Sequence, residues 1–305
     1  MNTRLLKYLA VAGFATSPAY AQVTAYIPEP GEFVATASYQ FQRYEDFWLG
    51  GGRFSLQTAT GYETQHQHST FITIEAGIAR RVAADVTLGY TWAEFVDGPP
   101  GSDDLSDDGL TDTTVGLRYR LVDEREITWL PTITARVGAI IAGTYDETFP
   151  FSAGDGANGV EASLHFGQQI CPNFGLYADV GYRWRENDVP DDIFGSAGVN
   201  LRWGGVTLSA GYRHIESVDG PDIGAPGFGT EFGFPQVREI QQNVEASLGY
   251  VDGGGRFYQV YYSRTIEGRN TGEKDILGLS VSIPFGGTGS HEAPLPPPGS
   301  YAKGK

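Results

Sequence analysis

The sequence predicts an all-β protein, a transmembrane antiparallel up-and-down β-barrel of about twelve strands with both termini on the periplasmic side. Segments in which apolar and polar residues alternate recur along the chain from Gln22 onward. The connections between them are by turns very short and long, as in outer-membrane barrels with tight periplasmic turns and long external loops. Aromatic residues share the apolar parity and gather toward both ends of the segments, which is typical of the two aromatic girdles of such barrels.

Residues 1–21 have the pattern of a secretory signal peptide. Arg4 and Lys7 flank the start of the apolar stretch 8–15, and Ala19-Tyr20-Ala21 supplies the small residues of a cleavage site. The apolar stretch is well under the roughly 20 residues that a membrane-spanning helix needs. We therefore expect a cleaved signal peptide and export to the outer membrane of a Gram-negative bacterium.

The composition limits the class of protein. The chain has 37 acidic and 21 basic residues, a formal net charge of −16. This balance disfavours nucleic acid as a partner, because a phosphate backbone calls for a basic surface. The single cysteine, Cys171, excludes disulfides within the chain. With 17 tyrosines and 17 phenylalanines, the composition is too aromatic for a disordered chain.

The strands follow from the alternation. Successive side chains of a strand point to opposite faces, so we expect the apolar parity to face lipid and the other parity to face the lumen. In the segment 115–121, for example, Val115, Leu117, Tyr119 and Leu121 alternate with Gly116, Arg118 and Arg120. Weaker segments complete the set of twelve predicted strands, which are 33–43, 69–79, 85–95, 112–121, 127–141, 159–169, 174–185, 192–202, 206–216, 240–250, 256–266 and 275–285.

Two alternatives to this architecture stay open. The strand count becomes fourteen if Phe54–Tyr62 in the first long loop forms another hairpin, and it becomes ten if one weak pair of segments is not stranded. A periplasmic β-sandwich also alternates, but it does not need loops sorted by length. We assign residues 22–286 to the barrel and the Pro-rich residues 287–305 to a flexible periplasmic tail, extended or disordered and not packed.

One stretch carries a family resemblance. Asp108–Leu121, DGLTDTTVGLRYRL, resembles the strand-entry pattern GLGD-x-x-x-G-x-K/R-Y-R-L of the outer-membrane family named for the MetA pathway of phenol degradation, with Thr111 in place of the usual middle glycine. The resemblance implies an outer-membrane channel associated with the uptake of small, often aromatic or apolar compounds. It supplies no catalytic residues.

Polar and charged side chains of the inward parity are the candidates for solute selectivity, because a charge inside a barrel is costly unless it is paired or hydrated. By height they sort into three groups. These are a periplasmic basic group of Arg118, Arg120 and Arg202, a mixed middle group of Glu75, Arg136, Asp179 and Glu245, and an outer group of Glu161, Arg183, Arg185 and Arg213. The turn near 170–173 should place Glu161 opposite Arg183, and His165 opposite Asp179. The candidate lumen residues are Glu75, Arg118, Arg120, Arg136, Glu161, His165, Tyr177, Asp179, Arg183, Arg202, Arg213 and Glu245, with Arg185 also inward.

These residues predict a passive channel for small solutes. Because arginines outnumber carboxylates in the set, and because Arg118, Arg120 and Arg202 form the periplasmic basic group, the pore should favour anionic or polarisable solutes. The same charges are equally expected of a structural network that plugs a closed barrel with a structural or surface-interaction role.

An outer-membrane hydrolase is a third alternative. A carboxylate-oriented imidazole, here His165 opposite Asp179, is half of a catalytic device. Ser163 is the nearest hydroxyl, but it lies on the same strand as His165 and no motif supports it as a nucleophile. We therefore predict no catalytic residues.

Metal and cofactor sites are not predicted either. His66 and His68 have the spacing of metal ligands on a strand, but we place them in a loop without carboxylate or cysteine support. The acidic run 103–108 does not match a calcium-binding loop. The expected partners are outer-membrane lipid, lipopolysaccharide and a small solute, and the expected state is a monomer.

Overall fold

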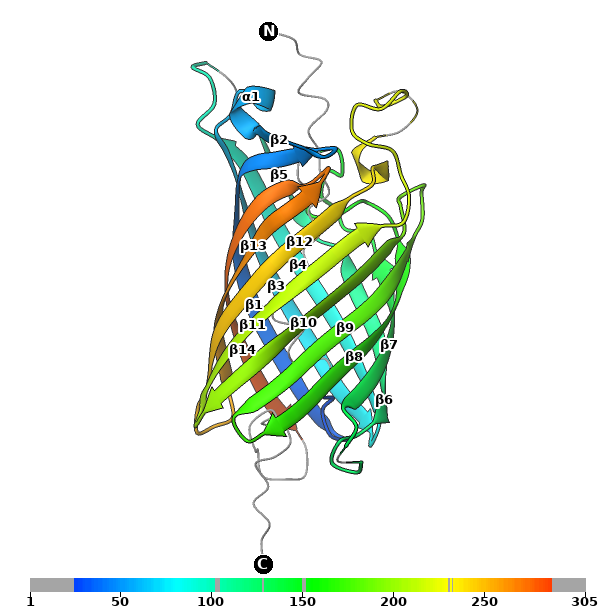
Figure 1. Ribbon diagram of the computed structural model, residues 1–305, viewed down its shortest axis with the longest axis vertical. Helices are drawn as coiled ribbons and strands as arrows, with labels where there is room; N and C mark the ends of the chain where they lie inside the picture. Colours follow the sequence, from blue (N-terminus) through cyan, green and yellow to red (C-terminus); the bar gives the residue numbers. More distant parts are fainter. Residues whose placement is uncertain are drawn as a thin grey trace, which may run out of the picture.

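The computed structural model describes residues 25–101, 105–127, 129–149, 152–229, 231 and 233–286. Within these residues, one antiparallel sheet of fourteen strands closes into a barrel, because β14 (Gly272–Gly286) pairs with β1 (Glu32–Leu49) (Figure 1). Twelve strands form the wall, whereas β2 (Gly52–Ser55) and β5 (Ser106–Leu110) pair only with parts of β1 and β4 (Val82–Val96). The predicted closed, twelve-stranded antiparallel barrel is confirmed.

The wall strands follow one another around the barrel in chain order. Besides β1, β4 and β14 they are β3 (Thr64–Ala79), β6 (Thr113–Val122), β7 (Thr132–Ile141), β8 (Gly159–Cys171), β9 (Phe174–Arg185), β10 (Asp192–Trp203), β11 (Val206–Ser217), β12 (Ile240–Val251) and β13 (Phe257–Arg269). β1 begins and β14 ends at the end of the barrel with the shorter turns, which we call the short-turn end (Figure 1). The opposite, long-loop end carries α1, β2 and β5.

Three strand boundaries were wrong by five residues or more: β1 ends at Leu49 and not at residue 43, β3 begins at Thr64 and not at residue 69, and β7 begins at Thr132 and not at residue 127. The preceding residues form turns, because the carbonyl of Asp123 accepts the backbone N–H groups of Glu126 at 2.9 Å and Ile127 at 3.0 Å. The Asp123 carboxylate also accepts the backbone N–H of Arg125 at 2.9 Å. This side chain therefore holds the connection in a turn and delays the strand.

Two connections at the long-loop end also differ from the sequence prediction. β13 and β14 are joined by Asn270 and Thr271 alone, where a longer loop was expected. Residues 54–62 add no wall hairpin, because they contain the end of β2 and the short helix α1 (Leu56–Thr60), whose N-cap is the Ser55 hydroxyl. No helix among the described residues has the length and apolarity that would let it cross a membrane.

The two faces of the wall confirm the predicted parity. On β6, Leu117 is 60% exposed whereas the next residue, Arg118, is 2% exposed. The same contrast separates Leu176 from Tyr177 on β9 and Leu277 from Ile276 on β14. The outer face is therefore an apolar band, and the polar side chains of the wall are gathered inside the barrel.

Several connections pack together at the long-loop end in one buried apolar cluster, which we call the apolar cap. The ring centroids of Phe95 and Phe149 are 5.6 Å apart, and those of Phe228 and Phe234 are 5.1 Å apart. Because Phe95 and Tyr44 lie on the inward parity of their strands, the apolar cap reaches into the lumen. Its members are Tyr44, Phe47, Leu56, Tyr62, Ala93, Phe95, Phe149, Ile223, Phe228, Phe234 and Val237.

The short-turn end is narrowed by the segment Ala25–Gly31, which lies against the inner wall. The carbonyl oxygen of Ala25 accepts the Thr134 hydroxyl at 2.6 Å, and that of Tyr26 accepts Arg118 Nη2 at 3.1 Å. Farther along the segment, the N–H of Gly31 donates to the carbonyl of Gly77 on β3 at 2.8 Å. Both openings of the lumen are thus partly filled by described parts of the chain.

Candidate functional site in the barrel lumen

The inner wall has a charged half and a neutral half. Strands β4 and β6 to β11 carry most of the inward charges, whereas β1, β3 and β12 to β14 present mainly glutamine, asparagine, serine and threonine. Glu75, Glu245 and Lys274 are the charged residues on the neutral half that face the lumen. A solute in the lumen would therefore contact ion pairs on one side and amides and hydroxyls on the other.

At the short-turn end, the arginines predicted as a basic group are already paired. Arg118 forms a close ion pair with Glu75, and Arg120 Nη1 lies 2.7 Å from Asp123 Oδ2. Arg202 lies apart from them and donates to the carbonyl of Gly204 at 3.1 Å. The grouping by height is therefore wrong in two respects, because Glu75 belongs to this layer and Arg202 does not join the other two arginines.

In the middle of the charged half, five side chains form a continuous belt of ion pairs across β4, β7, β8, β9 and β10. Arg136 bridges Asp85 at 2.7 Å and Glu161 at 3.0 Å. Glu161 also pairs with Arg183 at 3.3 Å, and Arg183 pairs with Asp192 at 3.3 Å. The predicted pairing of Glu161 with Arg183 is confirmed, and the belt gives each of these partly or fully buried charges a partner.

A second group lies on β8 to β12. Arg213 Nε donates to Glu245 Oε1 at 3.0 Å, with both side chains less than a tenth exposed. His165 stands opposite Asp179 in the register of β8 and β9, as predicted. The two do not bond, however, because Asp179 accepts the Ser196 hydroxyl and His165 Nε2 bonds the Ser163 hydroxyl at 2.9 Å.

This arrangement removes the basis of the hydrolase alternative. The Nδ1 atom of His165 and the Oδ2 atom of Asp179 have no hydrogen-bond partner among the described residues. Without a carboxylate that orients and stabilises the imidazole, a serine–histidine pair lacks the third member of a catalytic triad.

Two tyrosine rings occupy the lumen beside glycines of neighbouring strands. Tyr177 covers Gly198 and Gly211, since a Cβ atom on either glycine would collide with the tyrosine hydroxyl. Tyr261 covers Gly278 in the same way on the neutral half. Glycine lets the ring approach the backbone closely, so the wall accommodates large side chains on its inner face.

In the long-loop layer of the lumen, two carboxylates share one arginine. Arg185 pairs with Asp112 at 3.0 Å and with Asp155 at 3.4 Å. Burial raises the pKa of the Asp155 carboxyl to about 7, although the Arg185 charge lowers it. Asp112 also accepts the hydroxyl of Tyr145 at 2.5 Å, which fixes the loop after β7.

Sequence reasoning missed several inward carboxylates and one cation. Asp85 and Asp192 begin the predicted strands 85–95 and 192–202, so their parity already placed them inside. Lys274 precedes the predicted start of the last strand by one residue. With Asp85, Asp192 and the two partners of Arg185, Asp112 and Asp155, included, the arginines no longer outnumber the carboxylates, and the predicted preference for anionic solutes loses that support.

The outer face holds the predicted aromatic residues and an apolar hollow. His66 and His68 lie in β3 and not in a loop. His68 stacks on Trp92 with ring centroids 4.9 Å apart and bonds the Tyr39 hydroxyl at 2.7 Å, so it packs among the aromatic residues of the outer face. Among the described residues, no group of three or more histidine, cysteine or carboxylate side chains is placed to hold a metal ion.

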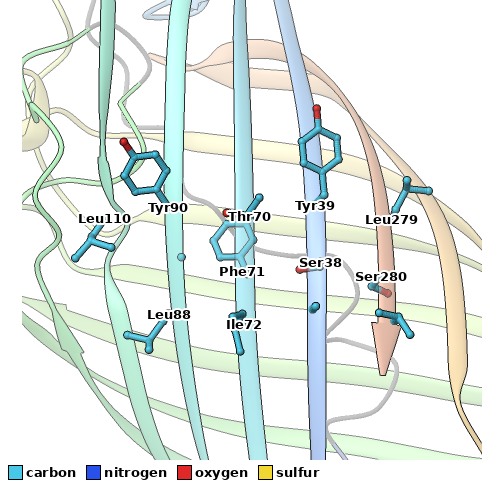
Figure 2. Close-up of a pocket in the computed structure, with 13 residues that line it drawn as sticks. Ser38, Tyr39, Thr70, Phe71, Ile72, Leu88, Tyr90, Leu110, Leu279 and Ser280 are labelled. Atoms are coloured by element: carbon cyan, nitrogen blue, oxygen red, sulfur yellow. The ribbon is translucent and has the colours of Figure 1, made fainter. Parts of the chain in front are cut away.

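The hollow has a volume of about 580 Å³ and lies across β14, β1, β3, β4 and β5. Tyr39 and Tyr90 stand at one end of it, with Ile72 and Leu88 at the other (Figure 2). It arises because small outward residues such as Ala37 lie between these large ones. Its lining is almost wholly apolar, so it continues the apolar band.

Comparison with solved structures supports the fold. The chain resembles an outer membrane channel from Pseudomonas putida F1, with a TM-score of 0.66 and 13% identity over 88% of this chain and 100% of that one. It also resembles the translocator domain of the autotransporter NalP from Neisseria meningitidis (TM-score 0.48, 15% identity, 85% and 90% of the two chains) and a mutant of the monoaromatic hydrocarbon channel TodX (TM-score 0.40, 11% identity, 91% and 97%).

No family model and no curated protein matches the sequence. The resemblance of Asp108–Leu121 to one particular channel family therefore stays a prediction. In the structure this stretch spans the end of β5, a break at Thr111 and Asp112, and β6. The chain has the fold of an outer-membrane β-barrel.

Proposed function

We propose that this protein is an outer-membrane channel through which small solutes pass by passive diffusion. The observation that supports the proposal is the sorting of side chains in a closed barrel, with an apolar outer face and most polar and charged side chains of the wall inside. A lumen lined by hydrogen-bonding groups and paired charges provides polar contacts for a solute without requiring a chemical step. The P. putida barrel, which shares this fold, is itself an outer membrane channel.

In the proposed orientation, the short-turn end and both termini face the periplasm and the apolar cap faces outward. This follows the usual arrangement of bacterial barrels, whose periplasmic turns are short and whose external loops are long. The outer face contacts membrane lipid, and the acidic loops contact the lipopolysaccharide layer. The barrel acts as a monomer, with residues 1–21 as a cleaved signal peptide and residues 287–305 as a periplasmic tail; both segments lie outside the described residues.

We further propose that the lumen selects solutes by size and by hydrogen bonding more than by net charge. Each arginine of the ion-pair belt is offset by a carboxylate, so the lumen does not present an excess of positive charge. The narrowed openings favour small solutes, and the aromatic rings of Tyr177 and Tyr261 favour those with an aromatic or apolar part. Candidate selectivity residues are therefore the paired groups of the belt and the rings beside them.

Solute uptake into proteoliposomes tests the proposal. Vesicles that contain the folded barrel should take up small neutral aromatic compounds faster than vesicles without protein. A larger probe, such as an oligosaccharide, should enter neither the vesicles with the barrel nor the vesicles without protein. A closed structural barrel is the competing function, because filled openings would also suit it, and it predicts no difference between the two kinds of vesicle for any solute.

A further inference from the structure

The segment Ala25–Gly31, which we call the strap, lies against the inner wall but outside the strand ladders. The pairing of β1 with β14 begins at Glu32, and its pairing with β3 begins at Phe33. Among the described residues, one backbone hydrogen bond joins the strap to a neighbouring strand, from Gly31 to Gly77 on β3. The wall therefore closes through its own strands and does not need the strap.

A tight turn joins the strap to β1. The carbonyl of Glu29 accepts the backbone N–H of Glu32 at 2.9 Å, and the Glu32 carboxylate accepts the backbone N–H of Glu29 at 3.0 Å. Between them, Gly31 has a φ of +82°, and a Cβ atom there would meet nothing within 4 Å. Glycine adopts such a conformation without steric cost and leaves it as readily, so this residue can act as a hinge.

Side-chain hydrogen bonds hold the strap in place. Two strap carbonyls accept such bonds from β6 and β7, as described above. In addition, the Ile27 carbonyl accepts Arg120 Nη2 at 3.3 Å, and the Tyr26 hydroxyl donates to Glu124 Oε1 at 2.8 Å. None of these bonds belongs to a strand ladder, so they can be broken without unzipping the wall.

The inner wall has room for the strap at two glycines. A Cβ atom on Gly77 of β3 would lie 2.0 Å from the Glu29 carbonyl oxygen, and one on Gly167 of β8 would lie 3.0 Å from the Ala25 Cβ. In the order of the wall, β4, β6 and β7 lie between these two strands. The strap thus crosses the inner surface of five neighbouring strands and covers part of the opening at the short-turn end.

We propose that the strap is a gate, which swings about Gly31 and sets the width of the short-turn opening. In its seated position it narrows the opening and contacts Arg118 and Arg120, which are 2% and 4% exposed. When it is released, the opening widens and these two side chains face the solute. In the mature chain proposed above, cleavage after Ala21 leaves the strap attached to the barrel at one end only.

The gate rests on the proposed channel function, so release of the strap is measured first without transport. Cys171→Ser removes the native thiol, and Ile27→Cys places one on the strap, where the side chain is 2% exposed. A charged maleimide should label it slowly in the folded barrel. Adding Tyr26→Phe should speed labelling about tenfold, the effect of losing one hydrogen bond to a charged group. Tyr258→Phe removes a tyrosine hydroxyl on the outer face and, as the matched control, should not change the rate.

A reversible lock then tests gating in a planar lipid bilayer. Ala25→Cys and Gly167→Cys, combined with Cys171→Ser, can be joined after a small shift, because the Cβ atoms of a disulfide are about 3.5–4.5 Å apart. The oxidised barrel should show only a small conductance level, and reduction should add transitions to a larger one. A chain that begins at Glu29 lacks most of the strap and should stay at the larger level.

Three results would overturn the gate, in variants shown to be folded by their faster migration in unheated gel samples. Equal labelling rates in Tyr26→Phe and Tyr258→Phe would mean that the Tyr26 hydroxyl does not restrain the strap. Equal conductance of the oxidised and reduced lock would mean that the strap is a fixed part of the lining. Faster labelling in Tyr26→Phe without any current, even from the truncated chain, would show that the strap moves but would refute the channel and with it the gate.

Discussion

Replacing Arg136 by methionine should destabilise the barrel more than any substitution at an exposed arginine. Arg136 donates three hydrogen bonds to Asp85, at 2.7, 3.1 and 3.2 Å, and one to Glu161 at 3.0 Å. Glu161 keeps Arg183 as a partner in the variant, but Asp85 loses its ion pair while 6% exposed. Removing one partner of a buried pair costs about 3–5 kcal/mol, so we expect a loss of that size.

Urea unfolding of the barrel in phospholipid vesicles, followed by tryptophan fluorescence, measures this loss. Arg256→Met is the control: its side chain is 56% exposed, its ion pair with Asp252 is 3.9 Å long, and exposed pairs contribute about 0–1 kcal/mol. Adding Asp85→Asn to the Arg136→Met variant should restore part of the stability, because the unpaired charge is then gone. If Arg136→Met and Arg256→Met were equally stable, or if adding Asp85→Asn restored no stability, the belt would not stabilise the barrel by pairing buried charges.

Three further predictions test which face of the wall contacts lipid, how closely Tyr261 packs on Gly278, and whether Asp155 is buried at the long-loop end. Leu176→Arg on the outer face should cost about 2–4 kcal/mol of unfolding free energy in vesicles, whereas Thr87→Arg on the inner face should cost less. Gly278→Val should cost about 1–3 kcal/mol or more, because a Cβ atom there overlaps the Tyr261 ring. The raised pKa of Asp155, about 7 against a usual 3.8, means that the folded state holds the proton more tightly. Stability should therefore fall as the pH rises from about 4 to about 7 and level off above, and Asp155→Asn should make that slope shallower.

Each of these has a control or an outcome that contradicts it. Equal costs for the two arginine substitutions would mean that the parity of the wall is wrong. Gly253→Ala, in open space at a turn, should leave stability unchanged. A similar loss of stability for the substitutions at Gly253 and Gly278 would mean that the Tyr261 ring does not pack closely on Gly278. A pH slope that is the same in the parent and in Asp155→Asn would mean that this carboxyl is not buried in solution.

The wall was predictable because a strand has a period of two residues. A single parity shift turns every side chain to the other face, so the alternation in 115–121 places Arg118 inside without reference to any other strand. The same logic set Glu161 opposite Arg183 once the turn between β8 and β9 was located. The face to which a side chain points and its partner across a tight turn depend only on neighbouring residues, so they can be predicted from the sequence.

What could not be predicted depends on contacts between residues distant in sequence. The pairing of Arg118 with Glu75 joins β6 to β3 and depends on the closure of the barrel. The segment Ala25–Gly31 and the loop residues of the apolar cap partly fill the openings of the lumen, and such irregular chain has no period to analyse. Lys274 was missed because it lies one residue outside a predicted strand.

The proposed channel is tested most directly by the current through single folded barrels in a planar lipid bilayer. We predict discrete conductance steps for the parent protein, with only weak preference between small anions and cations because Arg118, Arg120, Arg136 and Arg213 are each paired with a carboxylate. Arg136→Met should change that preference toward cations, since it leaves an unpaired carboxylate in the lumen. A bilayer that contains folded barrels, shows no conductance steps and takes up no small solute would contradict the channel and favour a closed structural barrel.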